Sequence, residues 1–203
     1  DFKIKDLISY STSLHRDQGF ELTNESHQKE LAEFLMDRLK YYMKEKQIRG
    51  DIIEASVSSH NLDNMNKIYN KASTLNSVIS KEIGEDIVIN YKRASSILSG
   101  ELKDKDIELS NTTDPGIFKN DYEKNLFKKI NELRKYFSSI NKDENYKETL
   151  IVLASAKKVI SDFFDNVKVN DEDKNIKKNR LELLQMLCRT FNNYINFSNI
   201  ETK

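Results

Sequence analysis

Apolar side chains recur along most of this chain at intervals of three and four residues, the spacing that buries one face of an α-helix. The pattern predicts a short helix over residues 3–15 and a longer one from about Thr23 to Gln47. Gly50 and Asp51 then open a short third helix. The first part of the chain is therefore expected to be helical, with turns at the polar stretches between these segments.

Two more helices are predicted in the middle of the chain. Asn61 and Asp63 are residue types that cap the N-terminus of a helix, and an apolar-periodic segment follows them. Gly84 is expected to break that helix. The segment from Glu85 to Gly100 again places its apolar residues on one face, and Gly100 is the expected C-terminal stop.

The C-terminal part of the chain begins with an irregular stretch. Residues 100–121 lack strong periodicity and contain the only proline, so they are expected to form an exposed connection. Three stronger helices follow over residues 121–137, 145–167 and 173–196, of which the second is apolar enough to be the central helix. Residues 166–170 alternate between polar and apolar, but such a short run between helices is interpreted as a loop.

These segments define the fold class as all-α, a bundle of about seven or eight helices with no convincing strand. The composition agrees, because five glycines and one proline are too few for the many turns of an all-β protein. The expected organisation is a short leading helix and linker over residues 1–22, belonging to an upstream domain, and a helical domain over residues 23–203. The chain begins at Asp1 rather than at methionine, which is interpreted as a fragment of a longer protein.

Charge and cysteine content limit the partners and the compartment. Lys and Arg total 33 and Asp and Glu total 33, so no global field attracts nucleic acid, and any RNA contact must come from local patches. Cys188 is the only cysteine, so a disulfide within the chain is impossible and a cytoplasmic location is the simplest expectation. No apolar run approaches the ~20 residues that span a membrane, and no signal peptide is visible.

The residue types that carry catalysis are not arranged for it. His15, His27 and His60 lie in separate segments without metal-ligand spacing. No glycine-rich phosphate loop and no nucleophile turn is present. The acidic run at residues 171–173 precedes a helix, where it complements the helix dipole. We therefore expect no catalytic residue, no metal site and no cofactor in this chain itself.

Four segments share their order and spacing with one protein family. They are FLMDRLKYYMKEKQIRGDIIEAS at residues 34–56, YKRASSIL at 91–98, FFDNVKVNDEDKNIKKNRLELL at 163–184 and FNNYINFSNI at 191–200. Together they resemble the C-terminal anticodon-binding domain of bacterial glycyl-tRNA synthetase beta subunits, a domain of the DALR class. The literal Asp-Ala-Leu-Arg signature is not present in this chain.

The resemblance implies a DALR-type helical bundle that holds the anticodon arm of the tRNA for glycine and is itself non-catalytic. In the whole enzyme it implies ATP-dependent attachment of glycine, with ATP and Mg at the alpha subunit, which the rest of the beta subunit contacts. Glycine codons begin GG, so the anticodon presents two cytosines for recognition. The alternative is a helical protein–protein interaction domain without RNA binding, which predicts an exposed apolar patch.

Basic and amide side chains near the shared motifs are the candidates for tRNA contact. Anticodon loops are bound by stacking unpaired bases on planar side chains and by gripping phosphates with Lys and Arg. Arg93 has an equally open alternative as a half-buried arginine paired with a carboxylate. The six candidates are Arg49, Lys92, Arg93, Lys177, Lys178 and Asn179.

Arg180 is interpreted differently, because it lies in line with the apolar residues of the last predicted helix. A buried unpaired arginine is costly. We therefore expect Arg180 to form a structural ion pair with Asp165 or Asp173.

Overall fold

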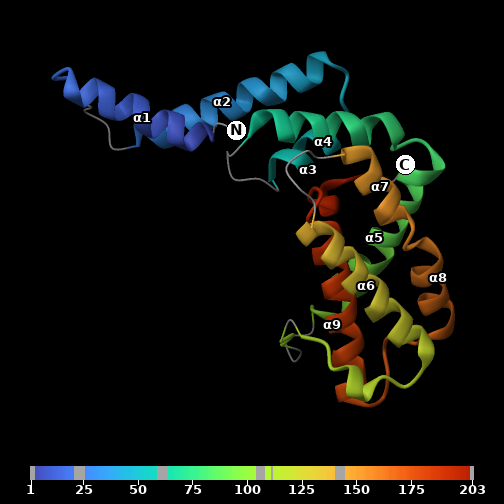
Figure 1. Cartoon of the computed structure of the whole chain (residues 1–203). Coiled ribbons are helices and arrows are strands. Elements are labelled where there is room, and N and C mark those ends of the chain that lie inside the picture. The colour runs from blue at the N-terminus through green and yellow to red at the C-terminus, as the bar shows by residue number, and fades with distance from the viewer. Residues whose placement is uncertain are drawn as a thin grey trace.

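The computed structural model describes residues 3–20, 26–58, 64–103, 108–110, 112–139 and 145–201. Every regular element in these residues is helical, which confirms the all-α fold class (Figure 1). The elements are α1 (Ile4–Asp17), α2 (His27–Glu45), α3 (Gly50–Ser58), α4 (Met65–Val78), α5 (Glu82–Glu101), α6 (Asp121–Ser139), α7 (Tyr146–Ala154), α8 (Lys157–Asn166) and α9 (Lys174–Phe191), with short 3₁₀ helices η1 (Pro115–Ile117) and η2 (Phe197–Asn199).

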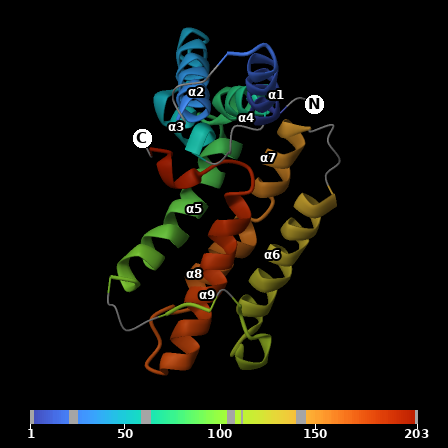
Figure 2. The same ribbon diagram turned by 90° about the vertical axis from the view of Figure 1, so that its left-hand side faces the viewer.

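Helix α9 is the centre of the molecule. It packs against α5 on one side and α6 on the other, and Figure 2 shows it between them. Ten of its 18 residues are buried, more than in any other described helix, including four charged or polar side chains. The prediction that the segment over residues 145–167 forms the central helix was therefore wrong. The last predicted helix, expected to reach Asn196, is the central one and ends at Phe191.

The segment expected as one helix over residues 145–167 is two, α7 and α8. Ala156 lies at the break and is fully buried, and its N–H donates to the main-chain oxygen of Leu153 (3.2 Å) in a tight turn. Helix α7 packs on α4 and α5, whereas α8 packs on α5 and α6. The break lets each half direct its apolar face to different neighbours, which one straight helix cannot do.

Gly84 does not break a helix, contrary to the sequence expectation. Helix α4 ends at Val78, and Gly84 lies in the first turn of α5. A Cβ atom on Gly84 would lie 2.3 Å from the main-chain oxygen of Val78, so glycine is required for the close approach of the two helices. The other expected stop, Gly100, lies in the last turn of α5, which ends at Glu101.

The described part of the irregular stretch before α6 is mostly exposed, but hydrogen bonds hold it against α9. The main-chain N–H of Ser110 donates to the Glu182 carboxylate (2.8 Å), and the Asn179 side chain pairs with both the N–H (2.7 Å) and the oxygen (3.0 Å) of Asp114. The expectation of an exposed connection is confirmed for most of its described residues, and buried polar groups on α9 provide their hydrogen-bonding partners. Residues 167–170 form a loop as predicted, with Val167 and Val169 buried, whereas Asn166 is the last residue of α8.

Helices α1 and α2 form a hairpin that projects from the bundle (Figure 1). Seven of its large apolar side chains are exposed: Leu7, Tyr10, Leu14, Leu31, Phe34, Tyr41 and Tyr42. The division of the chain at residue 22 stays a prediction. The expected helix-start residues Thr23, Asn61 and Asp63 lie outside the described residues, and the side chain that caps α4 is that of Asn64. No helix in the described ranges has the length and apolar character needed to cross a membrane.

Candidate nucleic-acid interface

The YKR segment of α5 lies against the C-terminal end of the chain. Tyr91 is buried, with its ring 5.7 Å from that of Phe197 and its hydroxyl 3.2 Å from the Asn192 side-chain nitrogen. Burial raises the pKa of Tyr91. This aromatic ring therefore belongs to the core and positions the two basic residues that follow it.

Lys92 is half-buried, and its Nζ donates to the main-chain oxygen of Ser198 at 3.0 Å. This bond ties η2 to α5. A carbonyl oxygen does not neutralise the ammonium group, so Lys92 still contributes a positive charge at this junction.

Arg93 pairs with a carboxylate, as one of its two interpretations expected, and its contact with RNA stays a prediction. Its guanidinium lies 4.5 Å from the centre of the Phe164 ring, and its Nη2 is 3.5 Å from Asp165 Oδ1. The Arg93 side chain is nevertheless 45% exposed. A guanidinium that lies over an aromatic ring and stays exposed is a planar group on which a base can stack.

Arg49 is not the free side chain that its place in a turn suggested. Its Nε and Nη2 donate to the two carboxylate oxygens of Asp51 (3.1 and 2.6 Å), and Nη2 also donates to the main-chain oxygen of Glu201 (3.2 Å). Asp51 in turn accepts from the N–H of Glu201 (2.8 Å). The arrangement fixes the guanidinium and anchors the C-terminal segment on α3.

Arg49 also lines an open pocket of about 380 Å³ beside α5. The other lining residues come from the junction of α4 and α5, from α5 itself and from the C-terminal segment: Ile79, Ser80, Glu85, Val88, Ile89 and Glu201. The lining therefore combines three apolar side chains with four polar or charged residues, and a mixture of this kind can bind and orient a small ligand.

The predicted basic patch at the start of α9 is mostly engaged within the chain. Lys177 Nζ lies 2.6 Å from Glu101 Oε2. Asn179 is buried, and its amide accepts from the N–H and donates to the main-chain oxygen of Asp114, so it is not on the surface where RNA could reach it. Lys178 is half-buried and has no carboxylate partner among the described residues. It is therefore the member of this patch that keeps an uncompensated charge.

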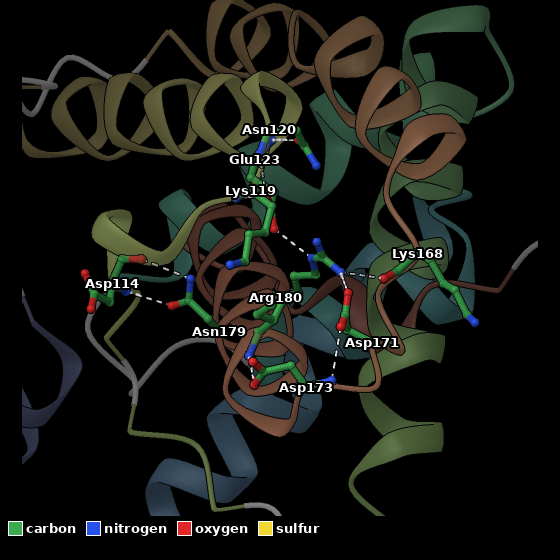
Figure 3. A network of polar contacts seen from close by, with 10 residues as sticks. Asp114, Lys119, Asn120, Glu123, Lys168, Asp171, Asp173, Asn179 and Arg180 are labelled. Carbon is green, nitrogen blue, oxygen red and sulfur yellow. Dashed lines mark hydrogen bonds and ion pairs between the residues drawn. The ribbon is translucent and has the colours of Figure 1, made fainter.

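Arg180 is buried and ion-paired, but not with the predicted partners. Figure 3 shows its guanidinium between Glu123 Oε1 and Asp171 Oδ2, both at 2.6 Å, and the main-chain oxygen of Lys168 at 2.9 Å. Asp165 instead faces Arg93, and Asp173 caps α9 by accepting from the N–H of Asn175 (2.8 Å). A main-chain N–H from Asp173, together with Arg180, lowers the pKa of Asp171.

Two buried carboxylates that sequence reasoning missed hold the bundle together. Glu123 accepts from Arg180 and from the main-chain N–H groups of Lys119 (2.7 Å) and Asn120 (3.1 Å) (Figure 3). Its signal in the sequence was its position three residues before the buried Leu126, in the apolar register of α6. Glu182, the second, accepts a hydrogen bond from the main-chain N–H of Ser110 (2.8 Å).

The described residues offer no arrangement for metal or thiol chemistry. No group of three His, Cys, Asp or Glu side chains in the described ranges is close enough to hold a metal ion. Burial raises the pKa of Cys188 to about 12, so this thiol is held in its unreactive protonated form. The basic side chains of Lys92, Arg93 and Lys178 can bind and position a ligand, but they are not arranged to react with it.

The fold is that of an all-α helical module, with basic side chains on its surface at Lys92, Arg93 and Lys178. The chain belongs to the DALR anticodon binding domain family, whose match covers residues 87–203.

Three proteins similar to this chain are beta subunits of glycine–tRNA ligases. The chain is 31% identical over 191 residues to the glycine–tRNA ligase beta subunit of Rickettsia prowazekii (strain Madrid E), covering 94% of this chain and 26% of that protein. It is 30% identical over 200 residues to the beta subunit of Rickettsia africae (strain ESF-5), covering 98% and 28%. A third beta subunit, from Dinoroseobacter shibae, is 29% identical over 163 residues, covering 80% and 23%. The resemblance predicted from the four motifs is confirmed, and the chain spans about a quarter of the length of these relatives.

Proposed function

We propose that this chain is the anticodon-binding part of a glycine–tRNA ligase beta subunit, and that it holds the anticodon arm of the tRNA for glycine. The observation that carries the proposal is the similarity to beta subunits over 94% of the chain, together with its place in the anticodon-binding family. Neutral net charge gives no general attraction to RNA, so recognition rests on a local surface.

The junction of α5 with the C-terminal segment is the surface proposed for this role. Arg93 on the Phe164 ring offers a planar face for a base. Lys92 offers a positive charge that could contact a phosphate of the tRNA. Lys178 adds an uncompensated cation at the start of α9. Arg49 contributes a fixed donor to the pocket.

The chemical step belongs elsewhere in the proposed enzyme. ATP-dependent attachment of glycine, with Mg, would take place at the alpha subunit, which the rest of the beta subunit would contact. The present chain would contribute binding energy and selection of the tRNA. Charging of tRNA for protein synthesis places the proposed enzyme in the cytoplasm.

The proposal is tested by titrating the full chain with the tRNA for glycine and with versions in which each anticodon cytosine is replaced by uracil. We expect salt-sensitive binding to the unaltered tRNA and weaker binding to the altered ones. Equal affinity for all of these RNAs at every salt concentration would refute an anticodon-binding role.

Charge reversal then maps the phosphate contacts. Lys178→Glu is expected to lower the slope of log affinity against log salt by about one unit, because one phosphate contact is lost. Lys5→Glu is the matched control, since Lys5 is exposed on α1, away from the proposed surface. An unchanged slope for Lys178→Glu removes this residue from the interface.

One observation favours the alternative of a protein–protein interaction domain. The exposed apolar side chains of the α1–α2 hairpin are a feature that this alternative predicts. The titration separates the two functions, because an interaction domain without an RNA role does not bind tRNA at physiological salt.

A further inference from the structure

We propose that the pocket beside α5 receives one unstacked cytosine of the anticodon, with Glu85 and Arg49 recognising its polar edge. The inference rests on the proposed function and adds to it the site, the base and the residue that distinguishes cytosine from uracil. The pocket volume of about 380 Å³ accommodates a single nucleobase with its sugar outside.

The apolar part of the pocket is suited to the face of a base. Ile79 and Val88 are buried and provide the floor. Ile89 lies at the pocket as well, but its side chain is 58% exposed, which leaves a large apolar group in water. A base placed against Ile89 would cover it, so binding would remove apolar surface from water on both partners.

The walls of the pocket are held in place before any ligand arrives. Gly84 allows the end of α4 and the start of α5 to approach closely, which brings Ser80 and Glu85 to the same rim. Asp51 is only 7% exposed and holds both the Arg49 guanidinium and the Glu201 main chain. A site whose donors are already fixed loses little conformational entropy on binding.

The polar rim combines a carboxylate acceptor with a guanidinium donor. Cytosine presents an amino group beside a ring-nitrogen acceptor and a carbonyl oxygen, and a glutamate or aspartate carboxylate is the usual partner of that amino group. Uracil presents a carbonyl oxygen in place of the amino group. This oxygen would face the Glu85 carboxylate, and two hydrogen-bond acceptors repel each other. The rim therefore favours cytosine over uracil.

The test is a titration of the full chain with the anticodon stem-loop of the tRNA for glycine and with versions carrying uracil at each cytosine position. When uracil replaces cytosine at one of the two positions, the affinity of the unmodified protein is expected to fall roughly 5- to 150-fold. This is the range of affinity that one specific base contact contributes. Glu85→Gln presents either an N–H or an oxygen to the base. This variant is expected to bind cytosine and uracil at that position within threefold of each other.

Ile89→Ser tests the stacking wall separately. It is expected to weaken binding of both RNAs by a similar factor, because an apolar contact does not distinguish the two bases. The matched controls are Glu132→Gln on α6 and Ile151→Ser on α7, exposed residues outside the pocket, and both are expected to leave the affinities unchanged. Thermal unfolding of each variant checks that the fold is intact.

The outcomes separate this inference from the proposed function. If the unmodified chain discriminates cytosine from uracil but Glu85→Gln discriminates equally well, the anticodon is recognised outside this pocket and the inference fails alone. If the unmodified chain does not discriminate at either position, the proposed function fails with it. Restored discrimination in Glu85→Asp, which keeps the carboxylate, would support recognition by charge and acceptor rather than by shape.

Discussion

Arg180 shows how one buried cation holds two helices and a loop. Its side chain is 7% exposed and that of Glu123 is 1% exposed, so Glu123 would be left with a buried, uncompensated charge without Arg180. Arg180→Met should therefore destabilise the fold by about 3–5 kcal/mol, measured by urea denaturation. Because the cost comes from the stranded carboxylate, adding Glu123→Gln should restore part of the loss.

The matched control is Arg93→Met, which removes an exposed pair with Asp165 and should cost less than about 1 kcal/mol. A loss for Arg180→Met no larger than for Arg93→Met would contradict the structural role of the buried pair.

Cys188 provides a second prediction at the scale of one residue. Burial raises its thiol pKa from the ordinary value of 9.0 to about 12. The folded state therefore favours the protonated thiol, so this contribution to stability is fully present below pH 9 and is lost as the pH rises toward 12. At about pH 8, labelling by iodoacetamide should proceed only as fast as the chain unfolds. Rapid labelling at that pH without denaturant, at the rate seen in urea, would show that the thiol is accessible.

At the scale of elements, the junction of α4 and α5 depends on the absence of one side chain. Gly84→Ala would place a Cβ atom 2.3 Å from a main-chain oxygen that cannot move independently of its helix, so a destabilisation of about 1–3 kcal/mol is expected. A Cβ atom on Gly100, in the same helix, would meet nothing within 4 Å, so Gly100→Ala should be neutral or stabilising by up to about 1 kcal/mol. Urea midpoints of the two variants measure the difference, and equal midpoints would argue against a close approach at Gly84.

The periodicity of apolar residues predicted some helices well and missed features that depend on packing. Periodicity located α1, α3 and α6 well, because each has one apolar face toward one set of neighbours. It did not distinguish a glycine that ends a helix from one that lets two helices touch. It also missed the break between α7 and α8, because that break depends on which neighbours each half meets.

The candidate site was predictable in composition but not in contacts. The motifs located the basic residues, yet the structure pairs Arg49 with Asp51 and Lys177 with Glu101. One of the two carboxylate partners of Arg180, Glu123, is 57 positions away along the chain, a contact that local patterns do not specify. Pairing across such distances is fixed by the packing of α6 on α9, and so it follows from the fold rather than from spacing.

At the scale of the whole molecule, stability is concentrated in the bundle around α9 and is low in the α1–α2 hairpin. Helix α1 buries only Ile8 and Thr12, and α2 is its principal contact, whereas α9 buries ten residues and packs between α5 and α6. Local opening of α1 therefore exposes little apolar surface, while opening of α9 requires global unfolding.

Hydrogen exchange followed by mass spectrometry measures this gradient. Amides of α1 are expected to exchange on the order of 100-fold or more faster than those of α9, at a rate independent of global stability. The destabilised Arg180→Met variant is the control: it should speed exchange in α9 and leave α1 unchanged, since the two helices open separately. Equal protection of α1 and α9, or a parallel loss of protection in both, would mean that the hairpin and the bundle unfold as one cooperative unit.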